Sequence, residues 1–234
     1  MPSRILHLAV TSRLADALPF RDPLRLAAGS VLPDAELLSG DPPVKAAHYP
    51  KLLCGGARKT LDLSGFRARF RDRLLTDDLV LGYYLHLCGD VIHRQIFYNE
   101  TGWNPTSRAA VRLLHRDYAL LNPIVIPEYG IRPEKVIPPP ETLEEIARDP
   151  LFSVNAFDIR GFYADMARDF DPPDVLPGEP DALPGEGDFT VFTPALAEEW
   201  IRRTAHALLP EVISLRGSGR STLDEDAMSW ERKK

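Results

Sequence analysis

The sequence predicts an all-α fold, a helical bundle with a proline-rich wrapping loop region, and three observations support this. Apolar residues recur at helical spacing through most of the chain, and no βαβ alternation is visible. Of the 22 prolines, 13 lie between Pro123 and Pro194. We therefore expect one helical domain over residues 1–215, in which the first part of the chain is compact and the second part is rich in loops. Residues 216–234 are expected to form a polar, disordered tail.

The first half of the chain is expected to be mostly helical. The pattern predicts helices over residues 5–18, 63–75, 79–98 and 107–121. Ser3 is a suitable cap for the first, and Pro105-Thr106-Ser107 opens the last. Tyr83 and Tyr84 are expected to pack in the core with their hydroxyl groups hydrogen-bonded.

The second half is expected to alternate short helices with proline-rich loops. Between Asn122 and Pro140, proline alternates with Ile and Val, which forbids a long helix and favours an ordered wrapping loop. Further helices are predicted over residues 142–148, 156–170 and 195–212, the last opened by Pro194. Residues 171–187 have the composition of a mobile connection.

The composition narrows the classes of function. The net charge is −6, with 34 acidic against 28 basic side chains, so nucleic acid is not expected as the main partner, although a local patch could hold one phosphate. No apolar run approaches the roughly 18 residues of a membrane-spanning helix, and no signal peptide is expected. Cys54 and Cys88 are too few for a disulfide scaffold, which favours a cytoplasmic location.

Three polar residues interrupt the apolar helix at 79–98. His86, Asp90 and His93 stand at i, i+4 and i+7, so one stripe of the helix carries all three. Burying the Asp90 carboxylate without compensation would cost several kcal/mol, so it either joins an internal polar network or binds a cation. For His93, polar packing is favoured over a role as ligand, orienting residue or proton donor. Arg94, at the helix exit, could meet a substrate phosphate.

Three further polar residues stand out in the first 50 residues. His7 interrupts an apolar helix, Asp34 follows Pro33, and His48 lies in a turn. Taken singly, they suggest a core histidine, a helix cap and a surface histidine. Taken with His86 and Asp90, they form a set of imidazoles and carboxylates of the kind that binds zinc, manganese or iron. They could close two adjacent metal sites that share Asp90.

The chain contains, in this order, His7, Pro33-Asp34, His48 and the helical element His86-Leu87-Cys88-Gly89-Asp90, which is preceded by Gly-Tyr-Tyr. This ordered series resembles the zinc-dependent phospholipase C family and its relatives, the fungal single-strand nucleases. The match covers roughly residues 5–98. The resemblance implies a helical bundle in which His7 and Asp90 hold one zinc ion, while Asp34, His48, His86 and Asp90 hold another. It also implies Asp34 as general base. His93 is at the wrong offset for the third metal of that family, so two ions are expected.

These features predict a zinc-dependent hydrolase that acts on a small phosphorylated metabolite or a lipid headgroup. Metal-activated hydroxide would attack phosphorus while Asp34 removes or orients a proton. Iron or manganese could replace zinc. Two other classes stay open: a binuclear iron oxygenase on a helical scaffold, and a non-catalytic helical interaction module with a buried hydrogen-bond network. The proline-rich segment from Asn122 to Pro194 could cover the pocket.

Overall fold

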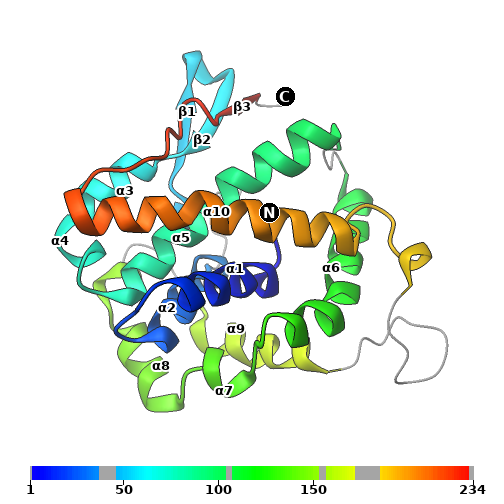
Figure 1. Cartoon of the computed structure of the whole chain (residues 1–234), viewed down its shortest axis with the longest axis horizontal. Coiled ribbons are helices and arrows are strands. Elements are labelled where there is room, and N and C mark those ends of the chain that lie inside the picture. Colours follow the sequence, from blue (N-terminus) through cyan, green and yellow to red (C-terminus); the bar gives the residue numbers. More distant parts are fainter. Residues whose placement is uncertain (1, 37–45, 104–106, 153–156, 172–184, 232–234) are drawn as a thin grey trace.

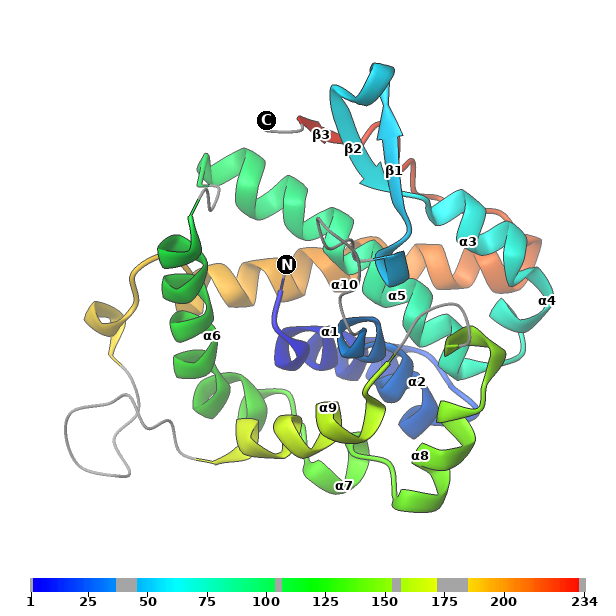
Figure 2. The same ribbon diagram turned by 180° about the vertical axis from the view of Figure 1, so that it is seen from behind.

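The all-α prediction is confirmed. A computed structural model describes residues 2–36, 46–103, 107–152, 157–171 and 185–231. Helices dominate these residues, and one small three-stranded antiparallel sheet projects from the helical body (Figures 1 and 2). No helix in these ranges is both long and apolar enough to cross a membrane.

Helix α1 (Arg4–Ala17) lies at the centre of the molecule, packed against α10, which runs above it in Figure 1. Ser3 caps α1 as predicted, because its hydroxyl oxygen accepts a hydrogen bond from the Leu6 N–H at 3.4 Å. Residues 5–11 of α1 are buried on all sides, so the polar side chain of His7 is held inside the core.

Helices α2 (Pro23–Gly29) and α5 (Asp78–His93) cross with their backbones in contact at two glycines. A Cβ atom on Gly29 would lie 2.1 Å from the Leu79 carbonyl oxygen, and one on Gly82 would lie 2.2 Å from the Leu26 carbonyl oxygen. Only glycine, which has no Cβ atom, lets the two backbones come this close. The crossing brings the segment after α2 against α5.

The sheet was not predicted from the sequence. Strands β1 (Pro50–Leu53) and β2 (Arg58–Leu61) form a hairpin with Pro50 opposite Leu61, and β3 (Trp230–Glu231) adds to the free edge of β2. The connection between β1 and β2 is the short turn η3 (Cys54–Gly56), in which Cys54 and both glycines have positive φ. Short alternating runs of this length carry little periodic signal.

The helices predicted at 63–75 and 79–98 are each divided in two. The first becomes α3 (Leu63–Arg69) and α4 (Arg71–Leu74), which are separated at Phe70. The second becomes α5, followed by the π-helical segment η4 (Arg94–Glu100). Tyr83 and Tyr84 are buried with bonded hydroxyl groups, as expected, because they donate to the Ala47 carbonyl and to Glu211 at 2.7 Å each.

The prediction of a wrapping loop from Asn122 to Pro140 is wrong for its first part. Helix α6 (Arg108–Glu128), capped by Ser107, continues through Pro123 and Pro127. A proline removes one N–H donor and crowds the preceding turn. In α6, Leu120, Leu121 and Val125 are buried in the core, and this burial outweighs the lost hydrogen bonds.

The remaining proline-rich region forms short helices along the lower edge of Figure 2. They are α7 (Pro133–Val136), α8 (Pro140–Ala147), η5 (Pro150–Phe152), α9 (Ile159–Met166) and η6 (Ala167–Phe170). The Asp158 N–H donates to the Ala35 carbonyl, which ties the start of α9 to the turn η1 (Leu32–Ala35). The segment predicted to be mobile, 171–187, lies mostly outside the described residues, apart from Asp171 and residues 185–187, which lead into and begin η7 (Glu186–Asp188).

The carboxy-terminal segment differs from the expected disordered tail. Helix α10 (Pro194–Ser218) is opened by Pro194 as predicted but passes through Pro210 and ends at Gly219, with φ 69°. The chain then returns along α10 to the hairpin, and the backbone N–H and hydroxyl of Thr222 both donate to Glu211. The Thr60 hydroxyl donates to the Glu225 carbonyl at 2.8 Å. The segment is polar, but its hydrogen bonds to Glu211 of α10 and to Thr60 of the hairpin hold its backbone in one conformation.

Asp117 of α6 holds the segment that leads into α10. It is fully buried, and its carboxylate accepts the backbone N–H groups of Thr190, Val191 and Phe192 at distances of 2.6 to 3.1 Å. Asp117→Asn would remove the negative charge that strengthens these hydrogen bonds and would turn an amide N–H₂ toward the Thr190 N–H, so we expect a loss of about 2 kcal/mol in the free energy of unfolding, measured by urea denaturation. The exposed Asp16→Asn is the control. Equal stability of the two variants would contradict this role.

Candidate metal centre

Helix α5 supplies the first two candidate ligands, His86 and Asp90, one turn apart on a buried face. The Nδ1 of His86 lies 2.9 Å from the Ser30 carbonyl oxygen, which can only accept a hydrogen bond. The proton of neutral His86 therefore sits on Nδ1, and Nε2 keeps a lone pair. Ser30 follows α2 directly, so the close α2–α5 crossing fixes the orientation of the imidazole.

Asp90 lies at the centre of the cluster, and its two carboxylate oxygens face different imidazoles. Oδ1 lies 3.6 Å from Nε2 of His7, whereas Oδ2 lies 3.6 Å from Nε2 of His48 and 3.8 Å from Nε2 of His86. These distances exceed those of hydrogen bonds, and neither oxygen has a hydrogen-bond partner among the described residues. A fully buried carboxylate with this surrounding is suited to bind a cation.

His48 and Asp34 come from two short turns rather than from long helices. His48 ends η2 (Ala46–His48), which is anchored because the Ala47 N–H donates to Glu36 at 3.0 Å and the Ala47 carbonyl accepts from Tyr83. Asp34 lies in η1, and its Oδ1 is 3.3 Å from Nε2 of His48. The same turn pair thus presents one imidazole and one carboxylate to α5.

Ligand atoms of His48, His86 and Asp90 all lie within 4.8 Å of one another, and Asp34 approaches this group at His48. Nε2 of His48 lies 3.2 Å from Nε2 of His86, 3.3 Å from Oδ1 of Asp34 and 3.6 Å from Oδ2 of Asp90. Ligands held at about 2.0–2.1 Å from a tetrahedral zinc ion are separated by roughly 3.3 Å. The donor set of two imidazoles and two carboxylates also suits zinc, manganese or iron. These residues therefore fit a divalent ion.

His7 adds a second candidate position on the other side of Asp90. Its ring stacks on His86 with 4.0 Å between centroids, and its Nε2 is buried with no hydrogen-bond partner among the described residues. Ligand atoms of His7, Asp34 and His86 lie within 4.8 Å of one another. A Cβ on Gly89 would lie 3.2 Å from the His7 ring, so this glycine lets α1 bring His7 against α5.

The surroundings of His86 and Asp90 favour the protonation states in which both side chains can donate a lone pair to a metal ion. Burial, assisted by the neighbouring His7, lowers the pKa of His86 to about 3, so its imidazole is neutral near pH 7. Burial alone would raise the pKa of Asp90, but the surrounding imidazoles of His86, His7 and His48 outweigh it and hold this pKa below its usual value. A neutral imidazole beside an ionised carboxylate is the protonation state that metal binding requires.

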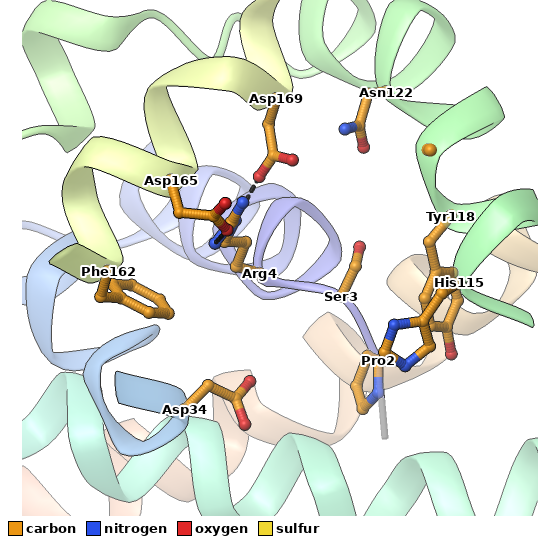
Figure 3. A pocket seen from close by; sticks show the side chains of 11 residues that line it. Pro2, Ser3, Arg4, Asp34, His115, Tyr118, Asn122, Phe162, Asp165 and Asp169 are labelled. Atoms are coloured by element: carbon orange, nitrogen blue, oxygen red, sulfur yellow. Dashed lines mark hydrogen bonds and ion pairs between the residues drawn. The ribbon is translucent and has the colours of Figure 1, made fainter. Parts of the chain in front are cut away.

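A cavity of about 520 Å³ opens beside the cluster, and Asp34 lies in its wall (Figure 3). Arg4 stands on the far side, hydrogen-bonded to Asp169 and paired with Asp165 at 2.8 Å. Phe162 of α9 also lines the cavity. The proline-rich region thus borders the cavity, in agreement with the suggestion that it could cover the pocket. A molecule in this cavity would reach the cluster of candidate ligands at Asp34.

The structure brings together all five residues proposed from the sequence as metal ligands, His7, Asp34, His48, His86 and Asp90. His93 is separate from them: its ring packs among Phe97, Tyr98, Phe192 and Trp200, and its Nε2 lies 3.4 Å from the Tyr118 hydroxyl. The packing interpretation of His93 therefore fits better than the ligand interpretation. Arg94 lines a different cavity, away from Asp34.

Sequence reasoning missed the residues that position the ligands. The Ser30 carbonyl orients His86, and Glu36 anchors the turn that carries His48. Asp165 and Asp169, which border the cavity, were also missed. A backbone carbonyl has no sequence signal, and an acid on an amphipathic helix looks like a solvated residue. Only their place in the fold shows what they contact.

No family model, curated protein or solved structure matches this chain. The candidate centre is therefore defined by its own geometry.

Proposed function

We propose that this protein is a metal-dependent hydrolase of a phosphoester, with zinc as the preferred ion and a small phosphorylated metabolite or lipid headgroup as substrate. The proposal depends on one observation: three imidazoles and two carboxylates from four elements of the fold converge at ligand spacing beside an open cavity. A divalent cation in such a site supplies Lewis acidity to a phosphoester and to an attacking water.

The residues of the chain have distinct roles in this proposal. Asp34 belongs both to the cluster and to the cavity wall, so it is placed to accept a proton from a water that attacks phosphorus. Asp90 faces His7 with one oxygen and His48 and His86 with the other, which suits a carboxylate shared by two ions. The proposal sets the activity in a reducing compartment such as the cytoplasm, in keeping with the free thiols of Cys54 and Cys88.

Elemental analysis and hydrolysis assays test the proposal together. Protein purified without chelator is expected to carry about two divalent ions per chain and to hydrolyse bis(p-nitrophenyl) phosphate. His48→Gln is expected to lose at least one ion and to lower kcat/KM by about 100-fold or more, since ligands matter more than outer-shell residues. His206→Gln, on the exposed face of α10, is the matched control.

The same measurements separate the alternatives. Iron in the protein together with dioxygen consumption would favour the oxygenase. Protein that takes up no stoichiometric zinc, manganese or iron, even on reconstitution, would favour the non-catalytic module and would contradict the hydrolase. The carboxylate oxygens of Asp90 are buried and have no hydrogen-bond partner within the described ranges, which argues against that module, because a hydrogen-bond network would satisfy them.

A further inference from the structure

A second polar cavity, of about 360 Å³, lies where the carboxy-terminal segment meets η4. Two arginines line it: Arg58 from β2 and Arg94, the first residue of η4. Ser229 and Trp230 form its other side. None of its lining residues borders the cavity that contains Asp34, so this cavity is distinct from the candidate metal centre. Arg58, Trp230 and Glu231 of its lining belong to strands β2 and β3, which lie at the upper edge of Figure 1.

The guanidinium of Arg94 is fixed between two aromatic rings. Its central carbon lies 4.6 Å from the centre of the Tyr98 ring and 4.9 Å from that of Trp230. Such stacking covers the faces of the planar group and leaves its N–H donors at the edges. Among the described residues, no acceptor or carboxylate meets these donors. Arg94 is thus ordered in advance, with its hydrogen-bonding capacity unused.

Arg58 is held on the opposite side by the segment before β3. Its Nε donates to the Ser229 hydroxyl at 2.8 Å, and one Nη donates to the Ser229 carbonyl. The other Nη makes no hydrogen bond within the described part of the chain. Glu231, the one carboxylate among the lining residues, is exposed and makes no ion pair with any described residue. Two arginines against one acid leave the lining positively charged.

We propose that this cavity binds a phosphate group, either inorganic phosphate or the phosphate of a small monoester. Planar guanidinium groups with free edge donors match tetrahedral oxyanions and give charge-assisted, paired hydrogen bonds. The aromatic stacking and the Ser229 contacts order both side chains before the anion arrives, which reduces the entropy lost on binding. The whole chain carries a net charge of −6, so this positive lining is a local feature. The proposal is independent of the proposed hydrolase activity.

Calorimetric titration of the chelator-treated full chain tests the site, since removing metal prevents phosphate from binding at the His and Asp cluster. Inorganic phosphate and glycerol 3-phosphate are the two probes, and the tighter one identifies the source of the phosphate. For the tighter probe, we expect saturable binding that weakens at least tenfold in Arg94→Gln and in Arg58→Gln. Arg94→Lys, which keeps the charge but loses the planar fork, is expected to weaken binding as well. Arg202→Gln, an exposed arginine paired with Glu199 at 2.8 Å, is the matched control and should bind like the wild type.

Two results would overturn the proposal. One is the absence of saturable binding of either probe by the wild-type chain at millimolar concentration. The other is equal affinity in the wild type and in folded Arg94→Gln and Arg94→Lys, which would show that Arg94 only attaches the carboxy-terminal segment. Circular dichroism of each variant confirms that lost binding does not arise from unfolding.

Discussion

Asp90→Asn is expected to abolish both the hydrolysis of bis(p-nitrophenyl) phosphate and the effect of chelators on stability. Asp90 faces three imidazoles with its two oxygens, so the substitution removes a negative ligand from both candidate positions at once. Loss of an outer-shell partner already costs about 10- to 100-fold in activity or metal affinity, so a shared ligand should cost more than about 100-fold.

Thermal unfolding with and without chelator measures the second effect. An ion present at about 1,000 times its Kd stabilises the folded chain by about 4 kcal/mol. For a chain of this length, that corresponds to a fall of roughly 10 °C in Tm when a chelator removes the ion. Asp90→Asn should show a change near zero, whereas the exposed Asp16→Asn should behave like the wild type. A chelator effect of wild-type size in Asp90→Asn would rule out Asp90 as a ligand.

Gly82→Ala is expected to produce a large loss of stability in the helical body. The added Cβ would lie 2.2 Å from the Leu26 carbonyl oxygen and 2.9 Å from the Ser30 backbone nitrogen, both of which belong to backbone that no rotamer change can move. Helix α2 must shift, at a cost of about 3 kcal/mol or more in the free energy of unfolding. Because the Ser30 carbonyl also orients His86, metal affinity should fall as well.

The matched control is Gly217→Ala, near the end of α10, where a Cβ would meet no atom within 4 Å. Alanine favours helices over glycine by up to about 1 kcal/mol, so this variant should be as stable as the wild type or slightly more stable. Urea denaturation gives both free energies, and metal analysis gives the effect on the site. If Gly82→Ala unfolds at the same urea concentration as the control, the close backbone crossing of α2 and α5 is not a constraint.

The sequence predicted the helices that carry His7, His86 and Asp90, because their apolar runs are long and are interrupted at few positions. His7 and His86 stood out as polar residues on buried faces, and the structure places both in the core. The joining of these helices to the turns of Asp34 and His48 was inferred from the ligand chemistry of the five residues and from the resemblance, not from any local pattern. That convergence depends on Gly29, whose role in the α2–α5 crossing has no local signal.

The failures of prediction came where tertiary contacts outweigh local preference. Pro123 and Pro127 predicted a loop, yet buried neighbours keep α6 helical. The polar segment after Ser218 predicted disorder, yet Glu211 and Thr60 give its backbone fixed partners. Both outcomes depend on residues more than ten positions away in the sequence or on the packing of other helices, which a local pattern cannot contain.

The attachment of the carboxy-terminal segment to the hairpin also sets the order of events during synthesis. Thr60 bonds to the Glu225 carbonyl across 165 residues, and β2 receives its second neighbour only from Trp230 and Glu231. At translation rates of roughly 5–20 residues per second, the hairpin edge is exposed for about ten seconds or more after it leaves the ribosome. The nascent chain therefore carries an unpaired strand until Trp230 and Glu231 emerge, and this is the stage at which chaperone protection would matter most.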